Sequence, residues 1–262
     1  MNLKNRFITL ACFLGVLVAA AIQLRRMESS AIVEAGKKGE QRYLSLAIAN
    51  EFSQVSQSLT RNCRTFVATG DKRYEDEYQH LLDWRSGTAP RPKYVNSLLY
   101  RGERKPQLDI MEELNFSAEE LDLLKKSGHL SAALVSTEVQ AMATIKQGKI
   151  APGPMKPLQG ESPQDFALRI VFDDAYHGEV QKILAPVNEF LAKLESRTAA
   201  EVKAYQGQAD RYATFSLIMQ LMIAAAIVGM VIYLIRSVFT PLSKGTKIVC
   251  QIAGGDYPPV SG

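Results

Sequence analysis

Two long apolar runs stand out in the pattern of hydrophobic and polar positions. Phe7 to Leu24 and Phe215 to Ile235 contain no charged residue and are 18 and 21 residues long. A helix rises about 1.5 Å per residue and the hydrocarbon core of a bilayer is about 30 Å thick, so both runs are long enough to cross it. The pattern predicts membrane-spanning helices over residues 7–24 and 214–236, with a polar segment, residues 25–213, between them.

The first apolar run has a second interpretation. Lys4 and Arg6 precede it and three alanines, Ala19 to Ala21, lie near its end. A basic start followed by an apolar run and small residues is also typical of a cleaved signal peptide. The run is long for a signal peptide, so we expect a span preceded by a short N-terminus, residues 1–6. Cleavage would leave the topology of the middle segment unchanged.

The start of the middle segment shows helical spacing. Apolar residues recur at steps of four and three positions, which is typical of a helix packed in a bundle. We expect this helix to run from about Ser30 to Thr69, continuous with the first apolar run, and Gly70 suits its C-terminal end. The series is Ile48, Phe52, Val55, Leu59, the polar residue Asn62, and Phe66.

Local signals predict further helices. One is expected over Lys72 to Trp84, before a loop rich in glycine and proline. Ser117 and Glu120 form a capping box, in which each side chain accepts a hydrogen bond from the backbone N–H of the other residue. The helix after them carries apolar residues at steps of four and three, except at Glu138, and it ends at a second loop from Gly148 to Gly160.

The last helix is expected to start at Ser162 and Pro163, a cap followed by proline at the first helical position. Its apolar face begins at Tyr176, and Pro186 is expected to kink or interrupt it. No run with strand periodicity occurs. Long helices that lead into two spans, joined by shorter helices, predict an all-α fold: an antiparallel helical (four-helix-type) bundle between two transmembrane helices.

The charges argue against a nucleic-acid partner. The net charge is +4, but residues 25–213 carry 26 side chains of each sign. A balanced segment has no excess positive field to attract phosphates. The three cysteines, Cys12, Cys63 and Cys250, fall in the first span, the middle and beyond the second span, so no intrachain disulfide is expected.

No catalytic or metal-binding pattern is present in the sequence. The histidines, His80, His129 and His177, are isolated, and neither HExxH spacing nor a glycine-rich phosphate loop occurs. We therefore expect a protein that is not an enzyme, with no catalytic residue, no metal site and no cofactor.

Polar residues on apolar helix faces are the candidate binding residues. Asn62, Glu138 and Tyr176 each occupy such a position, and His177 lies next to Tyr176. A buried carboxylate needs a hydrogen-bond donor or a proton. We hypothesise that the four side chains line one polar cavity that binds a small polar ligand. The alternative is structural: Asn62 sets helix register, and Glu138 leans to the bundle edge or pairs with a basic residue.

The segment after the second span, residues 237–262, carries a motif. From Val238 it reads VFTPLSKGTKIVCQIAGGDYPP, which resembles the start of a HAMP linker, the cytoplasmic coiled-coil relay of membrane receptors. Pro241 matches the proline at the linker's start, and Gly255 and Asp256 match the end of its first helix. Ile248 and Ile252 continue the helical spacing. A HAMP linker needs two helices and the sequence ends at Gly262, so no output function of such receptors is assigned to these residues.

The middle segment resembles the helical sensor domains of methyl-accepting chemotaxis proteins. The similar stretches are LTRNCRTFVATGDKRYEDEY at Leu59–Tyr78, SAALVSTEVQAM at Ser131–Met142 and FDDAYHGEVQKILAPVNEF at Phe172–Phe190. The resemblance implies the input half of a chemotaxis receptor. Such a protein is a homodimer in the inner (cytoplasmic) membrane, senses a small extracytoplasmic solute, and passes a helix displacement to a cytoplasmic signalling module. A sensor histidine kinase input module, or a membrane-anchored bundle without ligand, are the alternatives.

The resemblance also draws attention to Arg61 and Arg64. Helical-bundle chemoreceptors often bind ligands through arginines at a dimer interface, and a guanidinium group pairs well with a carboxylate-bearing ligand. Helical geometry places both arginines away from the face of Leu59, so a ligand role requires that face to be the dimer contact. The alternative is a solvated surface.

Overall fold

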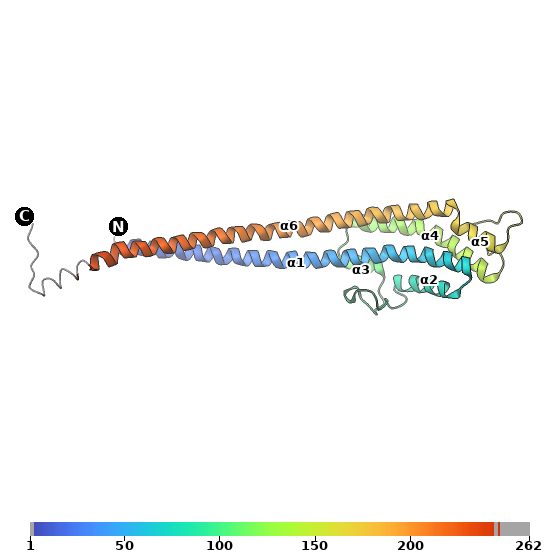
Figure 1. Ribbon diagram of the computed structural model, residues 1–262, viewed down its shortest axis with the longest axis horizontal. Helices are drawn as coiled ribbons and strands as arrows, with labels where there is room; N and C mark the ends of the chain where they lie inside the picture. Colours follow the sequence, from blue (N-terminus) through green and yellow to red (C-terminus); the bar gives the residue numbers. More distant parts are fainter. Residues whose placement is uncertain (1–2, 244–245, 247–262) are drawn as a thin grey trace, which may run out of the picture. The chain divides into compact units, whose positions relative to one another are not determined.

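The computed structural model describes residues 3–243 and residue 246, and this part of the chain is all α-helical, with no strand (Figure 1). This confirms the predicted fold class. The elements are α1 (Leu3–Thr69), α2 (Lys72–Arg85), the 3₁₀ turn η1 (Ser97–Leu99), α3 (Gln107–Glu113), α4 (Ala118–Gln147), α5 (Pro163–Phe172), α6 (Asp174–Leu234) and the π turn η2 (Ile235–Phe239).

The chain forms two compact units, and α1 and α6 contribute to both. One unit comprises Met1–Ala35 and Lys203–Gly262, and the other comprises Gly36–Val202, which we call the helical domain. In the first unit, α1 and α6 are each long and apolar enough to cross a membrane. The most apolar stretches of both helices are almost entirely uncovered by protein, as expected of helices whose apolar side chains face lipid.

The helical domain holds two apolar cores, which we name by the elements that close them. In the α3 core, α1 and α6 pack against η1, α3 and the start of α4; in the α5 core, they pack against α2, α5 and the rest of α4 (Figure 1). The apolar positions predicted for α1 are buried. They are Ile48 and Phe52 in the α3 core, and Val55, Leu59 and Phe66 in the α5 core.

The predicted helix ends are confirmed where a local cap sets them. Gly70 adopts a positive φ of 69° after α1, and its N–H donates to the carbonyl of Phe66 at 2.7 Å. Ser117 and Glu120 form the full capping box at the start of α4, and Ser162 caps α5 ahead of Pro163. Each of these signals needs only residues within one turn, so the sequence alone is sufficient to locate them.

The last helix breaks at a different place from the one predicted. The interruption falls at Asp173, between α5 and α6, whereas α6 runs through Pro186 without a break. Pro186 is buried between two core residues, and the hydroxyl of Ser127 donates to the carbonyl of Ile183 at 3.2 Å, within the turn that a proline disturbs. Packing around Pro186 keeps the helix continuous, although the proline removes the backbone N–H that would donate to the carbonyl of Lys182.

Alanine at Gly87 is expected to lower the free energy of unfolding more than alanine at Gly148. Both glycines have positive φ, 80° and 63°, where a Cβ costs about 1–2 kcal/mol. A Cβ at Gly87 would also lie 2.7 Å from Cδ and 2.8 Å from the backbone nitrogen of Pro106, whereas nothing lies within 4 Å at Gly148. We expect losses of about 2–4 and about 1 kcal/mol respectively. Thermal unfolding followed by circular dichroism compares them, and equal losses would contradict the close packing at Pro106.

Candidate functional site

Glu138 lies at the centre of the candidate site, on α4. Its side chain is buried, and each carboxylate oxygen accepts one tyrosine hydroxyl. Tyr78 on α2 donates to Oε2 at 2.8 Å, and Tyr176 on α6 donates to Oε1 at 2.6 Å. One carboxylate therefore joins three helices inside the α5 core.

Burial dominates the electrostatics around this carboxylate. It raises the pKa of Glu138, and the hydrogen bonds with Tyr176, Tyr78 and Thr60, together with the positive charge of Arg64, offset this only in part. Burial, together with the nearby negative charge of Glu138, also raises the pKa of both tyrosines. The same two causes raise the pKa of Cys63, whose Sγ lies 3.9 Å from the backbone carbonyl oxygen of Glu138. The hydroxyls of the two tyrosines and the thiol of Cys63 thus stay protonated, and the tyrosines act as hydrogen-bond donors.

A cavity of about 130 Å³ opens beside Glu138, between α1, α4 and α6. Its walls are mostly aliphatic, with a few hydroxyl and amide groups, and Glu138 is the only charged residue among them. A cavity of about 150 Å³ can hold benzene, so this one suits a ligand of a few carbon atoms. The lining residues are Ser56, Gln57, Leu59, Thr60, Ser131, Leu134, Val135, Glu138, Val180, Ile183 and Leu184.

The structure brings together only part of the predicted polar group. Glu138 lines the cavity, and Tyr176 donates a hydrogen bond to Glu138. Asn62 is buried, but it does not line this cavity, and its Nδ2 has no hydrogen-bond partner in the described part of the chain. His177 is exposed, with Nδ1 2.8 Å from the carbonyl oxygen of Asp173. His177 follows Tyr176 in sequence, but a turn of about 100° per residue directs it away from the core.

Tyr78, which donates to the carboxylate of Glu138, is a residue of this polar cluster that the sequence interpretation missed. Tyr78, Leu81 and Trp84 are buried on one face of α2. Their spacing of three residues is the signal that could have placed Tyr78 on a core face beside Glu138.

The two arginines lie in a second, more open hollow along α1, which shares Gln57 and Thr60 with the cavity beside Glu138. Arg61 is exposed, and Arg64 is half-buried. The guanidinium of Arg64 lies 5.1 Å from the ring centre of Phe172 and 4.8 Å from that of Tyr176, and its Nε donates to the carbonyl of Val171 at 2.8 Å. Its Nη2 also lies 3.3 Å from Nε2 of His177, so two of the predicted site residues meet here. Arg64 is thus held by packing and hydrogen bonds, and neither arginine lines the cavity beside Glu138.

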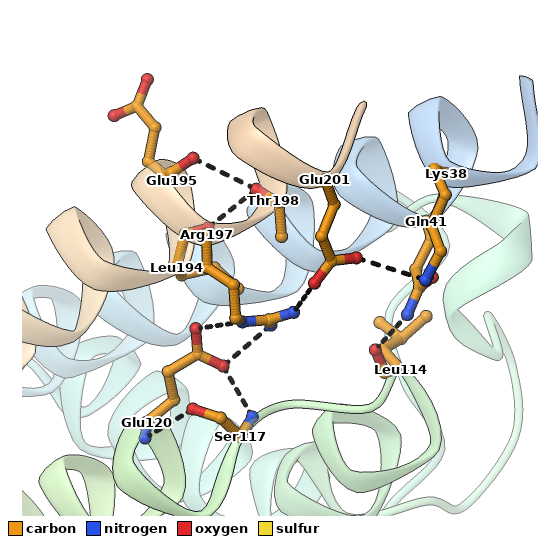
Figure 2. Close-up of polar contacts among 10 residues, drawn as sticks. All are labelled: Lys38, Gln41, Leu114, Ser117, Glu120, Leu194, Glu195, Arg197, Thr198 and Glu201. Carbon is orange, nitrogen blue, oxygen red and sulfur yellow. Dashed lines mark hydrogen bonds and ion pairs between the residues drawn. The ribbon is translucent and has the colours of Figure 1, made fainter. Parts of the chain in front are cut away.

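An ion-pair network, which we call the Arg197 network, joins α1, α4 and α6 at the α3 core (Figure 2). Arg197 on α6 binds the buried carboxylate of Glu120 through two hydrogen bonds, Nε to Oε1 at 2.8 Å and Nη2 to Oε2 at 2.9 Å. Its Nη1 donates to Glu201 at 2.8 Å, and Lys38 on α1 donates to the other oxygen of Glu201 at 3.2 Å. Burial raises the pKa of Glu201, but the bonds from Arg197 and Lys38 outweigh this and leave it below its usual value.

Replacing Arg197 by methionine is expected to lower the free energy of unfolding by about 2–3 kcal/mol. The carboxylate of Glu120 is only 2% exposed, and it would keep only the N–H of Ser117 as a donor in the described network. Breaking a buried pair typically costs about 3–5 kcal/mol, reduced here by the partial exposure of Arg197.

The matched control is Lys193→Met, one turn earlier on α6. Lys193 pairs with Glu119 at the surface, so its loss should have little effect on stability. Denaturant unfolding followed by circular dichroism measures both. Equal stability of the two variants would contradict a structural role for the Arg197 network.

The relay residues of the HAMP-like segment are only partly described. Pro241 follows the π turn η2, in which the hydroxyl of Thr240 donates to the carbonyl of Ile235 at 2.9 Å. Ile248, Ile252, Gly255 and Asp256 lie outside the described residues.

Within residues 3–243 and 246, no three or more histidine, cysteine, aspartate or glutamate side chains are grouped so as to hold a metal ion. Comparisons with known proteins leave the family open. The chain matches no family model, no curated protein and no solved structure at a significant level. The geometry of the Glu138 cavity and the two apolar helices is therefore the basis for a functional proposal.

Proposed function

We propose that this chain is the input half of a transmembrane chemotaxis receptor, and that a small solute binds in the Glu138 cavity. The observation that carries the proposal is which helices form the walls of the cavity. Two of the three helices that line the cavity, α1 and α6, are the same helices that contain the apolar, membrane-length segments. A molecule in the cavity contacts both of them at once.

Ligand binding would act by favouring one packing of α6 against α1 and α4. A ligand shifts an equilibrium only through contacts that differ between the two states. The residues Val180, Ile183 and Leu184 on α6 would supply such contacts, because they form one wall of the cavity. Displacements of about 1–2 Å are typical of helix shifts in switching proteins. The continuous helix α6 would carry this shift towards Pro241 and the HAMP-like segment.

The receptor proposal includes a homodimer in the inner (cytoplasmic) membrane, with the helical domain outside the cytoplasm and a cytoplasmic signalling module as partner. Its support is the resemblance of the segment from Val238 to a HAMP linker, which is a four-helix coiled coil of two chains. The two membrane-length helices support the membrane location.

A chimeric receptor tests the proposal. Residues 1–240 are joined to the HAMP linker and signalling module of a well-characterised chemoreceptor, and the activity of the coupled kinase is recorded while small solutes are added. We expect at least one solute to change the kinase activity. The variant Leu134→Trp, which fills the cavity, should abolish the response, and Ala133→Trp on the exposed side of α4 should retain it. A response that survives Leu134→Trp would exclude the cavity as the sensing site.

A further inference from the structure

We infer that the Glu138 cavity selects a small aliphatic amine, bound as its ammonium ion against the carboxylate of Glu138. The inference rests on the proposed function of the cavity as a ligand site, and it names the chemical class of the ligand. It follows from the charge, the unused acceptor capacity and the size of the cavity.

The charge of the cavity favours a cation. Glu138 is the only ionisable side chain among the residues that line it. Within the described part of the chain, no lysine, arginine or histidine forms an ion pair with Glu138. The basic group that influences it is Arg64, whose own contacts are with Val171, Phe172, Tyr176 and His177. A carboxylate buried without a cation is costly, and a ligand ammonium would supply the missing charge.

The carboxylate also has room for a further hydrogen bond. A carboxylate offers about four acceptor positions on its two oxygens. Tyr78 and Tyr176 each occupy one, and the side chain of Thr60 also hydrogen-bonds Glu138, which leaves about one position open. An ammonium group carries three N–H donors, and the hydroxyl groups of Ser131 and Thr60 in the cavity wall can accept from those that do not reach Glu138.

The rest of the cavity favours a short hydrocarbon chain. The walls opposite and beside Glu138 are formed mainly by Leu59, Leu134, Val180, Ile183 and Leu184. The volume of about 130 Å³ is slightly below that of cavities that accept benzene. A branched chain of about five carbons therefore fits the space, and burying it stabilises the complex by the hydrophobic effect.

A carboxylate-bearing ligand, which Arg61 and Arg64 suggested at the sequence level, has the wrong charge for this cavity. Both arginines belong to the second hollow along α1 and do not line the cavity. A second carboxylate would face Glu138 without a cation between them, and like charges in a desolvated site repel strongly.

Calorimetric titration of the full chain in lipid nanodiscs tests the inference with three probes that share one hydrocarbon skeleton. They are isoamylamine, isoamyl alcohol and isocaproate. At neutral pH we expect the amine to bind about tenfold or more tightly than the alcohol, since a hydrogen-bonded charge adds roughly a factor of ten or more to affinity. Isocaproate should bind most weakly. Glu138→Gln should remove the advantage of the amine and leave the affinity for the alcohol within about threefold.

A second variant keeps the test decisive if Glu138→Gln does not fold. Val135→Lys places a cation on the cavity wall at a half-buried position, and it should weaken binding of the amine more than binding of the alcohol, because the added charge repels only the ammonium ion. Two results would overturn the ligand class and leave the cavity as the binding site. One is that isocaproate binds as tightly as the amine. The other is that neither variant lowers the affinity for the amine. Absence of binding for all three probes, with a thermogram identical to that of Leu134→Trp, would overturn the cavity itself as the site of the proposed function.

Discussion

Replacing Arg91 by methionine is expected to lower the free energy of unfolding by about 3–5 kcal/mol, the range found when a buried ion pair loses one partner. The side chain of Arg91 is fully buried, and its Nη2 donates to both oxygens of Glu51, at 2.6 and 2.8 Å. Its Nε donates to the carbonyl of Leu99 at 2.7 Å. Methionine would leave Glu51, which is 13% exposed, with Gln107 as its remaining donor in the described structure.

Arg91 also organises the loop between α2 and α3. Its backbone N–H donates to the carbonyl of Glu103 at 2.8 Å, and its carbonyl accepts from Gly102 at 2.9 Å. The guanidinium lies 5.3 Å from the ring centre of the buried Trp84. Loss of the side chain therefore removes an anchor that joins the loop to both α1 and α2, beyond the ion pair itself.

A double variant separates the charge effect from the packing effect. Adding Glu51→Leu to Arg91→Met removes the uncompensated carboxylate, so part of the lost stability should return. Arg73→Met is the control, because Arg73 pairs with Asp71 at the surface, and little change is expected there. Denaturant unfolding of the detergent-solubilised chain measures all three. A loss for Arg91→Met no larger than for Arg73→Met would contradict the anchoring role.

The sequence predicts the helices well where the signal is local. The ends at Gly70, Ser117 and Ser162 depend on caps within one turn, and the burial of the α1 face depends on periodicity within one helix. The short helix α3, inside a segment rich in turn residues, was not predicted. Its buried residues Ile110 and Met111 belong to a core whose other members lie far away in sequence, and such tertiary packing overrides local propensity.

The sequence likewise predicts some residues of the candidate site and misses others. Glu138 and Tyr176 were identified because each is a polar group on an apolar helix face, and the structure joins them directly. Arg91 was missed because a basic residue between prolines is typical of a surface loop, whereas here it pairs with Glu51, 40 residues away. Contacts across such separations depend on how the helices pack, and no spacing rule within one segment encodes them.

The ionisation of Glu138 is expected to make the protein less stable as the pH rises from acid towards neutral. Burial raises the folded-state pKa of Glu138 above its ordinary value. Between these two values the folded chain holds a proton that the unfolded chain has released, and stability falls with rising pH wherever the folded state binds more protons. This contribution is complete below the ordinary pKa and is lost as the pH rises through the raised one. Glu138→Gln keeps the size of the side chain and removes the proton, so it should flatten this part of the stability profile.

Glu161 provides the control of opposite sign. Hydrogen bonds from Arg169 lower its pKa to about 2, so its contribution is present above the ordinary pKa and is lost as the pH falls through the lowered one. Glu161→Gln should therefore lower stability throughout the range above the ordinary pKa, and it should change the slope of the profile on the acid side only. Urea unfolding of the wild type and both variants across this pH range gives the two profiles. A slope between acid and neutral pH that Glu138→Gln leaves unchanged would show that Glu138 does not titrate there.

Glu138→Ala is expected to have the largest effect at this site, lowering the free energy of unfolding by about 2–5 kcal/mol. The alanine leaves the hydroxyl groups of Tyr78 and Tyr176 without the acceptor that each uses inside the core, and an unsatisfied buried polar group costs about 1–3 kcal/mol. Adding Tyr78→Phe and Tyr176→Phe to Glu138→Ala removes both orphaned hydroxyls, so the triple variant should recover most of the loss. Recovery would show that the hydroxyl–carboxylate bonds dominate. A triple variant less stable than Glu138→Ala would instead assign the loss to the enlarged cavity, because deleted core atoms lower stability in proportion to the space they leave.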